Sequence, residues 1–407
     1  MPAPKRRQRT RRSPRVIVAT LLAALLGTGA VACDSTADPN AFPGRDAQAT
    51  MANQFPTHTF TGTDDAARVA SEASFVVCGP GKCTPDILAV MRYVNPHIQI
   101  AEYDSATAAM ANEVIASCQA RDAANNTLVN GFWGTFIEKP NCQEWINHVR
   151  DSCWQSVYVE GYDTCYLDLM TEHDVKYISR DSKTMAQAPP ANYPIEQWQA
   201  DKYSMLVQIS NAIGRPLWVN CFNSGADWPN SLALTAGCND TRYVSIAQAE
   251  LGSEALDTPQ EVAANWDRIA SMLQQAGPRV LFDCKLETGD DVTEHLCEVL
   301  WLMYSNNDLI GIYHNQFHDP TIQLDPSLAN IRGLGAPQGD AVVYGTLVRN
   351  FKCGYAVMNK SWFPYFGTVK ADSGYLDLSG NGYFAGQPFM LGPMQAQAFR
   401  STGGCTP

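Results

Sequence analysis

Two acidic residues of this chain each follow a short apolar run, and together they could carry out acid–base chemistry. Asp168 ends residues 161–168, whose core of Cys, Tyr and Leu is typical of a buried strand, and Glu250 ends residues 243–250. Two carboxyl groups about 5–5.5 Å apart can hydrolyse a glycosidic bond, one as the nucleophile and the other as the proton donor. The alternatives are a helix cap or ion-pair partner for Asp168 and an ordinary exposed acid for Glu250.

Further polar residues lie at the ends of other expected strands. If the carboxyl ends of parallel strands meet at one face, carboxylates, amides and aromatic rings converge there, as a sugar site requires. The substrate-binding residues expected on this basis are Tyr103, Asp104, Trp133, Asn220, Gln248, Asp283, His314 and Asn315. Asp104 could instead cap a helix, and Asp283 adjoins Cys284 in a region that could be structural.

Other polar residues are not expected to take part in catalysis or metal binding. Asp163 lies in the turn before its strand, at the opposite end from Asp168, where a structural role is expected. His314 and His318 are four residues apart, but Asn315 indicates strand and loop rather than the helix face on which that spacing holds a metal. No metal or cofactor is therefore expected. A metal-dependent hydrolase is kept as an alternative function, beside a glycosidase and a carbohydrate-binding protein.

The elements that would position these residues alternate between helices and strands. Pro194 begins a helix that ends at Gly214, and a strand follows at 217–220. A capping box at 258–261 begins another helix, which ends before a strand at 280–283. The eight strands expected from this alternation are residues 75–78, 98–104, 128–133, 165–168, 217–220, 243–250, 280–283 and 310–314.

This alternation predicts an α/β fold, a (β/α)8 TIM barrel, with a small C-terminal all-β domain. After residue 332, short apolar segments broken by Gly, Asn, Ser and Pro replace the helical pattern. The expected organisation is a signal peptide at 1–32, a polar linker and entry segment at 33–60, the catalytic barrel at 61–332 and a small β-sheet domain at 333–407.

The N-terminus has the composition of an export signal. Seven basic residues precede an apolar run from Val16 to Leu26, and small residues before Cys33 form a cleavage site. The chain has 13 cysteines, so a lipid on Cys33 would leave an even number for disulfides in an oxidising compartment. We expect an extracellular protein, secreted or attached to the outer face of the cell membrane as a lipoprotein. The local disulfides expected are Cys78 with Cys83, Cys221 with Cys238, and Cys284 with Cys297.

The charge balance restricts the partners. Without residues 1–32, 22 basic residues remain against 41 acidic ones, a net charge of −19. Such a chain repels phosphate backbones, so no nucleic acid partner is expected. Neutral or basic partners remain. The expected partner is a polysaccharide or oligosaccharide substrate, and the protein is expected to be a monomer.

Two segments resemble known enzymes. Residues 161–168, GYDTCYLD, resemble the "GYDGvfLD" strand of barrel glycoside hydrolases, including the hypothetical glycosyl hydrolase family fifteen and the endo-α-1,4-polygalactosaminidase-like proteins. Residues 351–359, FKCGYAVMN, are similar to the "nGxvlvNps" strand that follows many such barrels. The sequence departs from the pattern at Leu169 and Thr164, where many relatives have a second acid and a glycine.

The resemblance implies roles for the two acids. As in α-galactosidase-type barrels, Asp168 on strand four would be the nucleophile and Glu250 on strand six the proton donor. The expected function is therefore a glycoside hydrolase that cleaves a cell-surface or environmental polysaccharide. A non-catalytic carbohydrate-binding barrel is the alternative.

Overall fold

The structure is a computed structural model of the 407-residue chain. The residues that it describes are 51–55, 60, 62–130, 134–170, 192–223, 237–250, 279–284, 291–304, 309–314, 330–331, 333–343 and 346–403.

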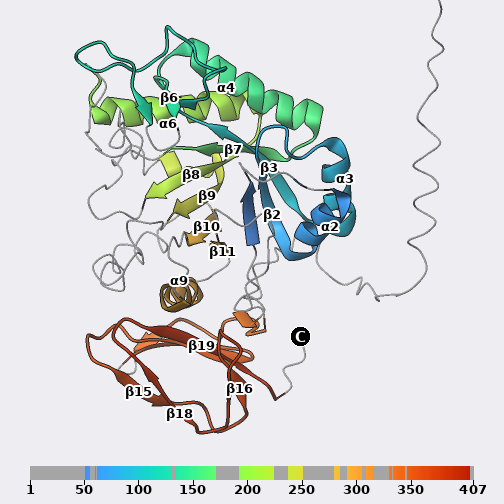
Figure 1. Cartoon of the computed structure of the whole chain (residues 1–407), viewed down its shortest axis with the longest axis vertical. Coiled ribbons are helices and arrows are strands. Elements are labelled where there is room, and N and C mark those ends of the chain that lie inside the picture. The colour runs from blue at the N-terminus through green and yellow to red at the C-terminus, as the bar shows by residue number, and fades with distance from the viewer. Residues whose placement is uncertain are drawn as a thin grey trace, which may run out of the picture. The chain divides into compact units, whose positions relative to one another are not determined.

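Eight parallel strands form one sheet, in which each strand lies beside its neighbour in the chain (Figure 1). In this order they are β1 (Met51–Phe55), β2 (Ala73–Cys78), β3 (Gln99–Ser105), β7 (Thr164–Asp168), β8 (Leu217–Asn223), β9 (Val244–Glu250), β10 (Arg279–Cys284) and β11 (Leu309–His314). The first and last strands, β1 and β11, contact each other. Because all eight strands run in the same direction, their carboxyl ends lie at one end of the sheet.

Helices connect several of these strands. They are α2 (Thr63–Glu72), α3 (Pro85–Val94), α4 (Gln143–Gln155), which the π-helical turn η2 (Ser156–Glu160) continues, α6 (Ile195–Ile213) and α9 (Asp291–Tyr304). Helix α2 packs against α3, and α4 packs against α6. The buried face of α4 carries Trp145, Ile146, Val149 and Cys153, which recur at helical spacing. Among the described residues, no helix has the length and apolar character needed to cross a membrane.

The observed strands agree with seven of the eight expected ones, and the α/β alternation is confirmed. The strand expected at 128–133 is wrong as a member of this sheet. Val129–Asn130 (β5) instead belongs to a small antiparallel sheet with β4 (Ala108–Ala109) and β6 (Thr135–Ile137). The eighth parallel strand is β1, in the segment expected to be a linker. The helix expected between Pro194 and Gly214 is confirmed, whereas the capping box at 258–261 lies outside the described residues.

The C-terminal region consists of β-strands, as expected from the change of pattern after residue 332, and the structure shows that they pair antiparallel. Its larger sheet has the order β12-β13-β14-β19-β16-β17, and β15 pairs with β18. These strands are β12 (Val342–Val343), β13 (Leu347–Phe351), β14 (Gly354–Met358), β15 (Tyr365–Thr368), β16 (Tyr375–Leu376), β17 (Gly382–Tyr383), β18 (Pro388–Leu391) and β19 (Ala396–Ser401). One face of the larger sheet packs on the β15–β18 pair through Tyr355, Val357 and Phe399. Helix α9 contacts β14 and β19.

Four disulfides lie within the described residues. Cys78–Cys83 and Cys221–Cys238 confirm two of the expected pairs. The other two are Cys118–Cys142 and Cys153–Cys165, and Cys353 is also disulfide-bonded. Cys33 and the side chains of Cys284 and Cys297 lie outside the described part of the chain. This use of cysteine is typical of an oxidising compartment.

Candidate active site

The carboxylate of Asp168 ends the fourth strand, β7, and accepts three hydrogen bonds from described residues. Tyr103 donates its phenolic hydroxyl to Oδ2 at 2.7 Å. Asn220 donates its side-chain amide to Oδ1 at 2.9 Å, and the backbone N–H of Leu169 donates to the same oxygen at 2.7 Å. An ionised carboxylate only accepts hydrogen bonds, so this set of donors matches the charged form and fixes its orientation.

Tyr103 reaches Asp168 from the neighbouring strand β3. It is the Cα partner of Tyr166 in the β3–β7 ladder, and the two ring centroids are 5.9 Å apart. Burial, followed by the negative charge of Asp168, raises the pKa of Tyr103 well above its usual value. Tyr103 therefore keeps its proton and acts as a hydrogen-bond donor to Asp168.

Side chains from non-neighbouring strands also meet on this face of the sheet. Tyr166 on β7 donates its hydroxyl to Gln248 Oε1 on β9 at 2.7 Å, across the intervening strand β8. The rings of Phe75 on β2 and Trp218 on β8 are 5.7 Å apart, although two strands separate them. Such contacts require a strongly curved sheet, and we refer to its concave side as the inner face.

A turn with unusual backbone geometry follows Asp168. Leu169 has a φ of 57°, in the left-handed region that side-chain-bearing residues rarely occupy. Its carbonyl accepts a hydrogen bond from the ammonium of Lys202, a fully buried residue of α6, at 2.5 Å. The next N–H, of Met170, donates to the Asn220 carbonyl at 3.1 Å. Helix α6 and strand β8 thus hold the turn that orients Asp168.

Asp104 does not join this group, because consecutive residues of a strand point to opposite faces. Its Oδ1 accepts the backbone N–H of Ser105 at 2.8 Å, and Ser152 of α4 hydrogen-bonds to its side chain. Burial raises the pKa of Asp104 to about 7. Nor does Asp104 cap a helix, because β3 continues to Ser105 and the short strand β4 follows.

Glu102 shares this outer face of the sheet with Asp104. Its carboxylate accepts hydrogen bonds from the Ser156 hydroxyl and, at 3.2 Å, from the backbone N–H of Gly81. Burial is the main cause of a raised pKa here as well. Glu102 therefore joins the sheet to η2 and to the loop closed by the Cys78–Cys83 disulfide.

Asp163 lies at the amino end of β7, and its contacts are structural, as expected. Its Oδ2 accepts the backbone N–H of Ile100 at 2.8 Å, and Oδ1 lies 3.3 Å from an Arg92 nitrogen in a half-exposed ion pair. Its carbonyl accepts a hydrogen bond from Arg215 at 2.7 Å. These contacts attach the start of β7 to the neighbouring elements, far along the strand from Asp168.

The other expected site residues are described only in part. Glu250, Asp283 and His314 lie near the carboxyl ends of β9, β10 and β11, where Asp283 pairs with Glu250 and Cys284 with His314 in the ladders. Their side chains lie outside the described part of the structure. Trp133 and Asn315 lie outside it altogether.

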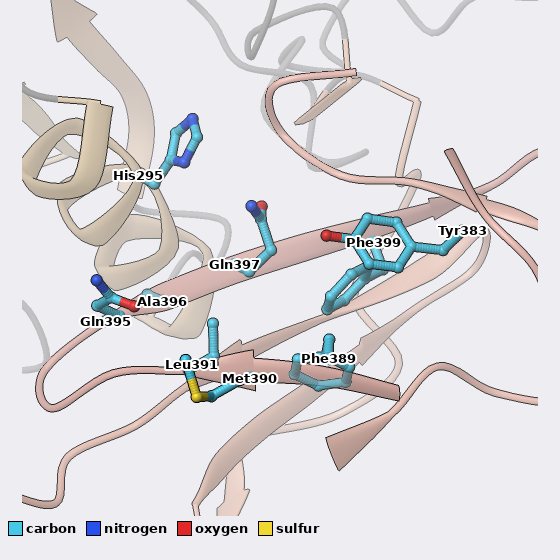
Figure 2. A pocket seen from close by; sticks show the side chains of 9 residues that line it. All are labelled: His295, Tyr383, Phe389, Met390, Leu391, Gln395, Ala396, Gln397 and Phe399. Carbon is cyan, nitrogen blue, oxygen red and sulfur yellow. The ribbon is translucent and has the colours of Figure 1, made fainter. Parts of the chain in front are cut away.

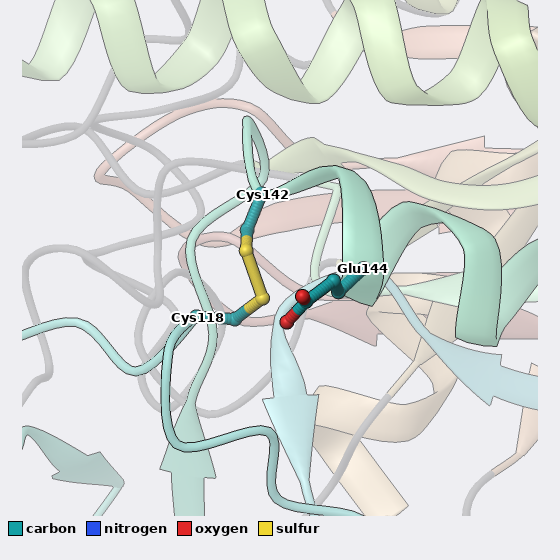
Figure 3. A group of neighbouring side chains, drawn as sticks. All are labelled: Cys118, Cys142 and Glu144. Atoms are coloured by element: carbon teal, nitrogen blue, oxygen red, sulfur yellow. A yellow bond between two sulfur atoms is a disulfide. The ribbon is translucent and has the colours of Figure 1, made fainter.

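Within the described residues, Cys118, Cys142 and Glu144 bring three potential ligand atoms within 4.8 Å of one another (Figure 3). The two sulfur atoms are joined in a disulfide, so neither can act as a thiolate ligand. The Glu144 carboxylate accepts a hydrogen bond from Ser117. This group therefore does not have the chemistry of a metal site.

Sequence reasoning missed two residues that support the candidate site, Tyr166 on the inner face and Lys202 on helix α6. Tyr166 precedes Asp168 by two positions, so the period of a strand was a usable signal that it shares the same face. Lys202 carries no comparable signal, because its contact depends on how α6 lies against the end of β7.

The sequence matches no known family model, and no curated protein sequence is significantly similar to it. The similar solved structures include the glycoside hydrolase domain of PelA from Pseudomonas aeruginosa, with a TM-score of 0.42 and 13% identity over 66% of this chain and 94% of that domain. An α-amylase from Malbranchea cinnamomea has a TM-score of 0.48 and 9% identity over 90% of this chain and 98% of its own. A pullulanase from an Anoxybacillus species has a TM-score of 0.47 and 9% identity over 87% and 70%. Similarity at this level identifies neither a family nor a shared site.

Proposed function

We propose that the protein is a glycoside hydrolase whose nucleophile is Asp168 and whose proton donor is Glu250. The observation that carries the proposal is the contact between Tyr166 and Gln248, 2.7 Å long, which spans from the fourth strand to the sixth on the inner face. It supports the idea that side chains of these two strands can act on one bound molecule.

A step of two residues along each strand leads from this contact to the proposed catalytic pair. Asp168 follows Tyr166 by two positions, and Glu250 follows Gln248 by two. Since strand residues two apart share a face, this register favours opposed carboxyl groups at the carboxyl ends of β7 and β9. A separation of about 5–5.5 Å would suit a retaining mechanism, which is the mechanism that we propose.

The contacts of Asp168 fit the work of a nucleophile. Tyr103 and Asn220 hold the carboxylate as an oriented anion, so it can attack an anomeric carbon without first being reorganised. The acid/base group would protonate the leaving oxygen and then recover the proton from the water that releases the sugar. The buried amides of Asn220 and Gln248 have the chemistry to bind sugar hydroxyls beside this centre.

We further propose that the parallel sheet closes as a (β/α)8 barrel, which the contact between β1 and β11 supports. The substrate would be a cell-surface or environmental polysaccharide. Export of the chain, either free or anchored through a lipid on Cys33, is proposed from its N-terminal composition. Replacing Cys33 with Ala should release the protein from the membrane fraction if the anchor exists.

The test is a hydrolysis screen of the purified mature protein against neutral polysaccharides, with Asp168→Asn and Asp163→Asn compared on the first substrate found. Both variants exchange a carboxylate for an amide in the same eight-residue segment. Asp168→Asn should lower kcat at least about a thousandfold, because a covalent mechanism cannot proceed without its nucleophile. Asp163→Asn should stay within about threefold of wild type, since its amide oxygen can still accept the Ile100 N–H.

Three results would count against parts of the proposal. Full activity of a folded Asp168→Asn variant would remove Asp168 as the nucleophile. Binding of a polysaccharide without any hydrolysis would instead favour a carbohydrate-binding protein. For an active enzyme, NMR of the first-formed product should show retention at the anomeric carbon, and inversion would reject the retaining mechanism.

A further inference from the structure

The C-terminal sheets and helix α9 line a half-open pocket of about 170 Å³, none of whose lining residues belongs to the inner face around Asp168 (Figure 2). Its lining residues come from α9, β17, β18, β19 and the turn before β19, and they are His295, Tyr383, Phe389, Met390, Leu391, Gln395, Ala396, Gln397 and Phe399. A cavity of about 150 Å³ holds one benzene molecule. The pocket is therefore of a size for a single six-membered ring.

Aromatic and polar groups occupy different parts of this pocket. Tyr383, Phe389 and Phe399 gather at one end, and Gln395 and His295 lie toward the other, with Gln397 between them (Figure 2). The Phe389 and Phe399 ring centroids are 4.8 Å apart, so they form a fixed apolar wall. None of the nine lining residues is a carboxylate, a lysine or an arginine, which favours an uncharged ligand.

The two glutamines are held so that their amide donors remain for a ligand. Gln397 Oε1 accepts the backbone N–H groups of Leu378 and Ala398, at 3.0 and 2.9 Å. Gln395 Oε1 accepts the backbone N–H of Gly392 at 2.7 Å. With both oxygens engaged, the amide NH₂ groups have no acceptor among the described residues. Fixed donors beside aromatic rings suit a ligand that combines oxygen acceptors with an apolar ring face.

We propose that this pocket binds one pyranose unit of a neutral glycan, as a second carbohydrate site that does not take part in catalysis. The amides of Gln395 and Gln397 would donate to sugar oxygens while a ring face lies on the aromatic wall. The inference goes beyond the proposed hydrolase function and does not depend on it, because binding at this site requires neither Asp168 nor Glu250.

Exposed apolar side chains continue from the pocket to the surface. Met390 lines the pocket and is 60% exposed, and its cross-strand partner Phe366 is 75% exposed. Because directly paired residues of an antiparallel ladder point to the same face, these two side chains form one surface. This surface would give a second sugar of the same chain an apolar contact beside the bound unit.

The experiment measures binding of neutral hexasaccharides of glucose, galactose and N-acetylglucosamine to the full mature chain by titration calorimetry. The chain carries Asp168→Asn so that no probe is consumed. Gln397→Glu and Gln395→Glu keep the oxygen acceptor that each turn uses and replace the NH₂ donor with a negative oxygen. The matched control is Trp362→Ala, which removes an exposed aromatic ring of the same domain that does not line the pocket.

At least one hexasaccharide should bind to the pocket. Each glutamate variant should raise the Kd of this binding tenfold or more, and Trp362→Ala should change it less than twofold. A hexauronic acid probe should bind this site at least tenfold more weakly. If the proposed catalytic cleft also binds the probe, the stoichiometry should fall from two to one in the glutamate variants. Unchanged binding by both glutamate variants with unchanged melting temperatures, or no binding of any neutral probe, would overturn the inference. An active enzyme without this site rejects only the inference, and a chain that binds here but hydrolyses nothing rejects only the proposed function.

Discussion

Strands β3 and β7 present two faces that use polar residues in different ways. On the inner face, Asp168 accepts hydrogen bonds from Tyr103, Asn220 and the backbone of Leu169. On the outer face, Glu102 and Asp104 lie beneath α4 and η2, and serine hydroxyls are their side-chain partners. The inner carboxylate, Asp168, lies among oriented amide and phenol donors. For the outer carboxyl groups, Glu102 and Asp104, burial is the main influence on the pKa and raises it.

This contrast indicates that, within each of these two strands, the inner-face residues serve catalysis and the outer-face residues serve stability. Burial disfavours the charged form of a carboxyl group, so the raised pKa values of Glu102 and Asp104 suit groups that hold a helix in place. The outer face also carries the Cys153–Cys165 disulfide, which joins α4 to β7. If the division is correct, outer-face substitutions should change stability and inner-face substitutions should change activity.

The largest effect should come from Asp104→Asn. Burial raises the pKa of Asp104 from 3.8 to about 7, so its contribution to stability is complete below about pH 4 and is lost as the pH rises toward 7. A pKa difference of one is worth about 1.4 kcal/mol, so ionised Asp104 should cost roughly 2–4 kcal/mol after partial solvation. The variant should therefore exceed wild type in unfolding free energy by about that amount at pH 8 and by little at pH 4.

Denaturant unfolding at several pH values measures this difference. The matched control is Asp151→Asn, which changes an exposed carboxylate on α4, next to the Asp104 partner Ser152, and should show no such pH dependence. A constant difference between pH 4 and pH 8 would contradict the assignment, and so would a large loss of hydrolytic activity in Asp104→Asn.

The second effect should come from removing the Cys153–Cys165 disulfide by replacing both cysteines with Ala. The bond closes a chain segment with a sequence separation of 12, and in the chain-entropy model its loss costs about 3 kcal/mol. The unfolding free energy should fall by about that amount, while kcat at a temperature below the transition stays within about threefold. A greater loss of kcat in a folded variant would show that the outer face controls the orientation of Asp168.

The alternation of side-chain direction along a strand decides how well the sequence could predict which residues lie on each face. Asp168 was identifiable because it ends an apolar run, and the helix from Pro194 to Gly214 was marked by its terminal residues. Tyr103 and Asp104 were both expected in the site, yet consecutive strand residues cannot share a face. Choosing between them required the β3–β7 register, in which Tyr103 pairs with Tyr166.

Other features depended on contacts that no local pattern specifies. Strand β1, MANQF, has neither alternation nor many β-branched residues, so only its pairing with β2 identifies it. Val129–Asn130 has the apolar start of a strand but pairs antiparallel with β6, outside the main sheet. The buried contact between Lys202 and the Leu169 carbonyl depends on the packing of α6.

The third effect should come from Tyr103→Phe on the inner face. The variant keeps the ring beside Tyr166 and removes the hydroxyl that donates to Asp168. A hydrogen bond to a charged group is worth about 1.5–3 kcal/mol, so kcat should fall roughly ten- to a hundredfold if that bond orients the nucleophile. Steady-state kinetics on the first substrate found would measure it. Tyr166→Phe is the matched control, since it removes a hydroxyl bound to Gln248 rather than to Asp168, and an equal loss in both variants would remove the special role of Tyr103.

The smallest effect, from Trp145→Phe, tests whether the two faces are coupled. Trp145 on α4 donates its indole N–H to the Ala106 carbonyl at 2.8 Å, and the N–H of Ala106 donates to the Asp168 carbonyl at 3.0 Å. Losing the indole donor leaves a buried carbonyl with one partner fewer, which should lower the unfolding free energy by about 1–2 kcal/mol. If the backbone of Asp168 is held independently by the β3–β7 ladder, kcat should change less than about twofold. A tenfold loss of kcat with only this modest destabilisation would mean that α4 positions the nucleophile through Ala106, and the separation of chemistry from support would then fail at this point.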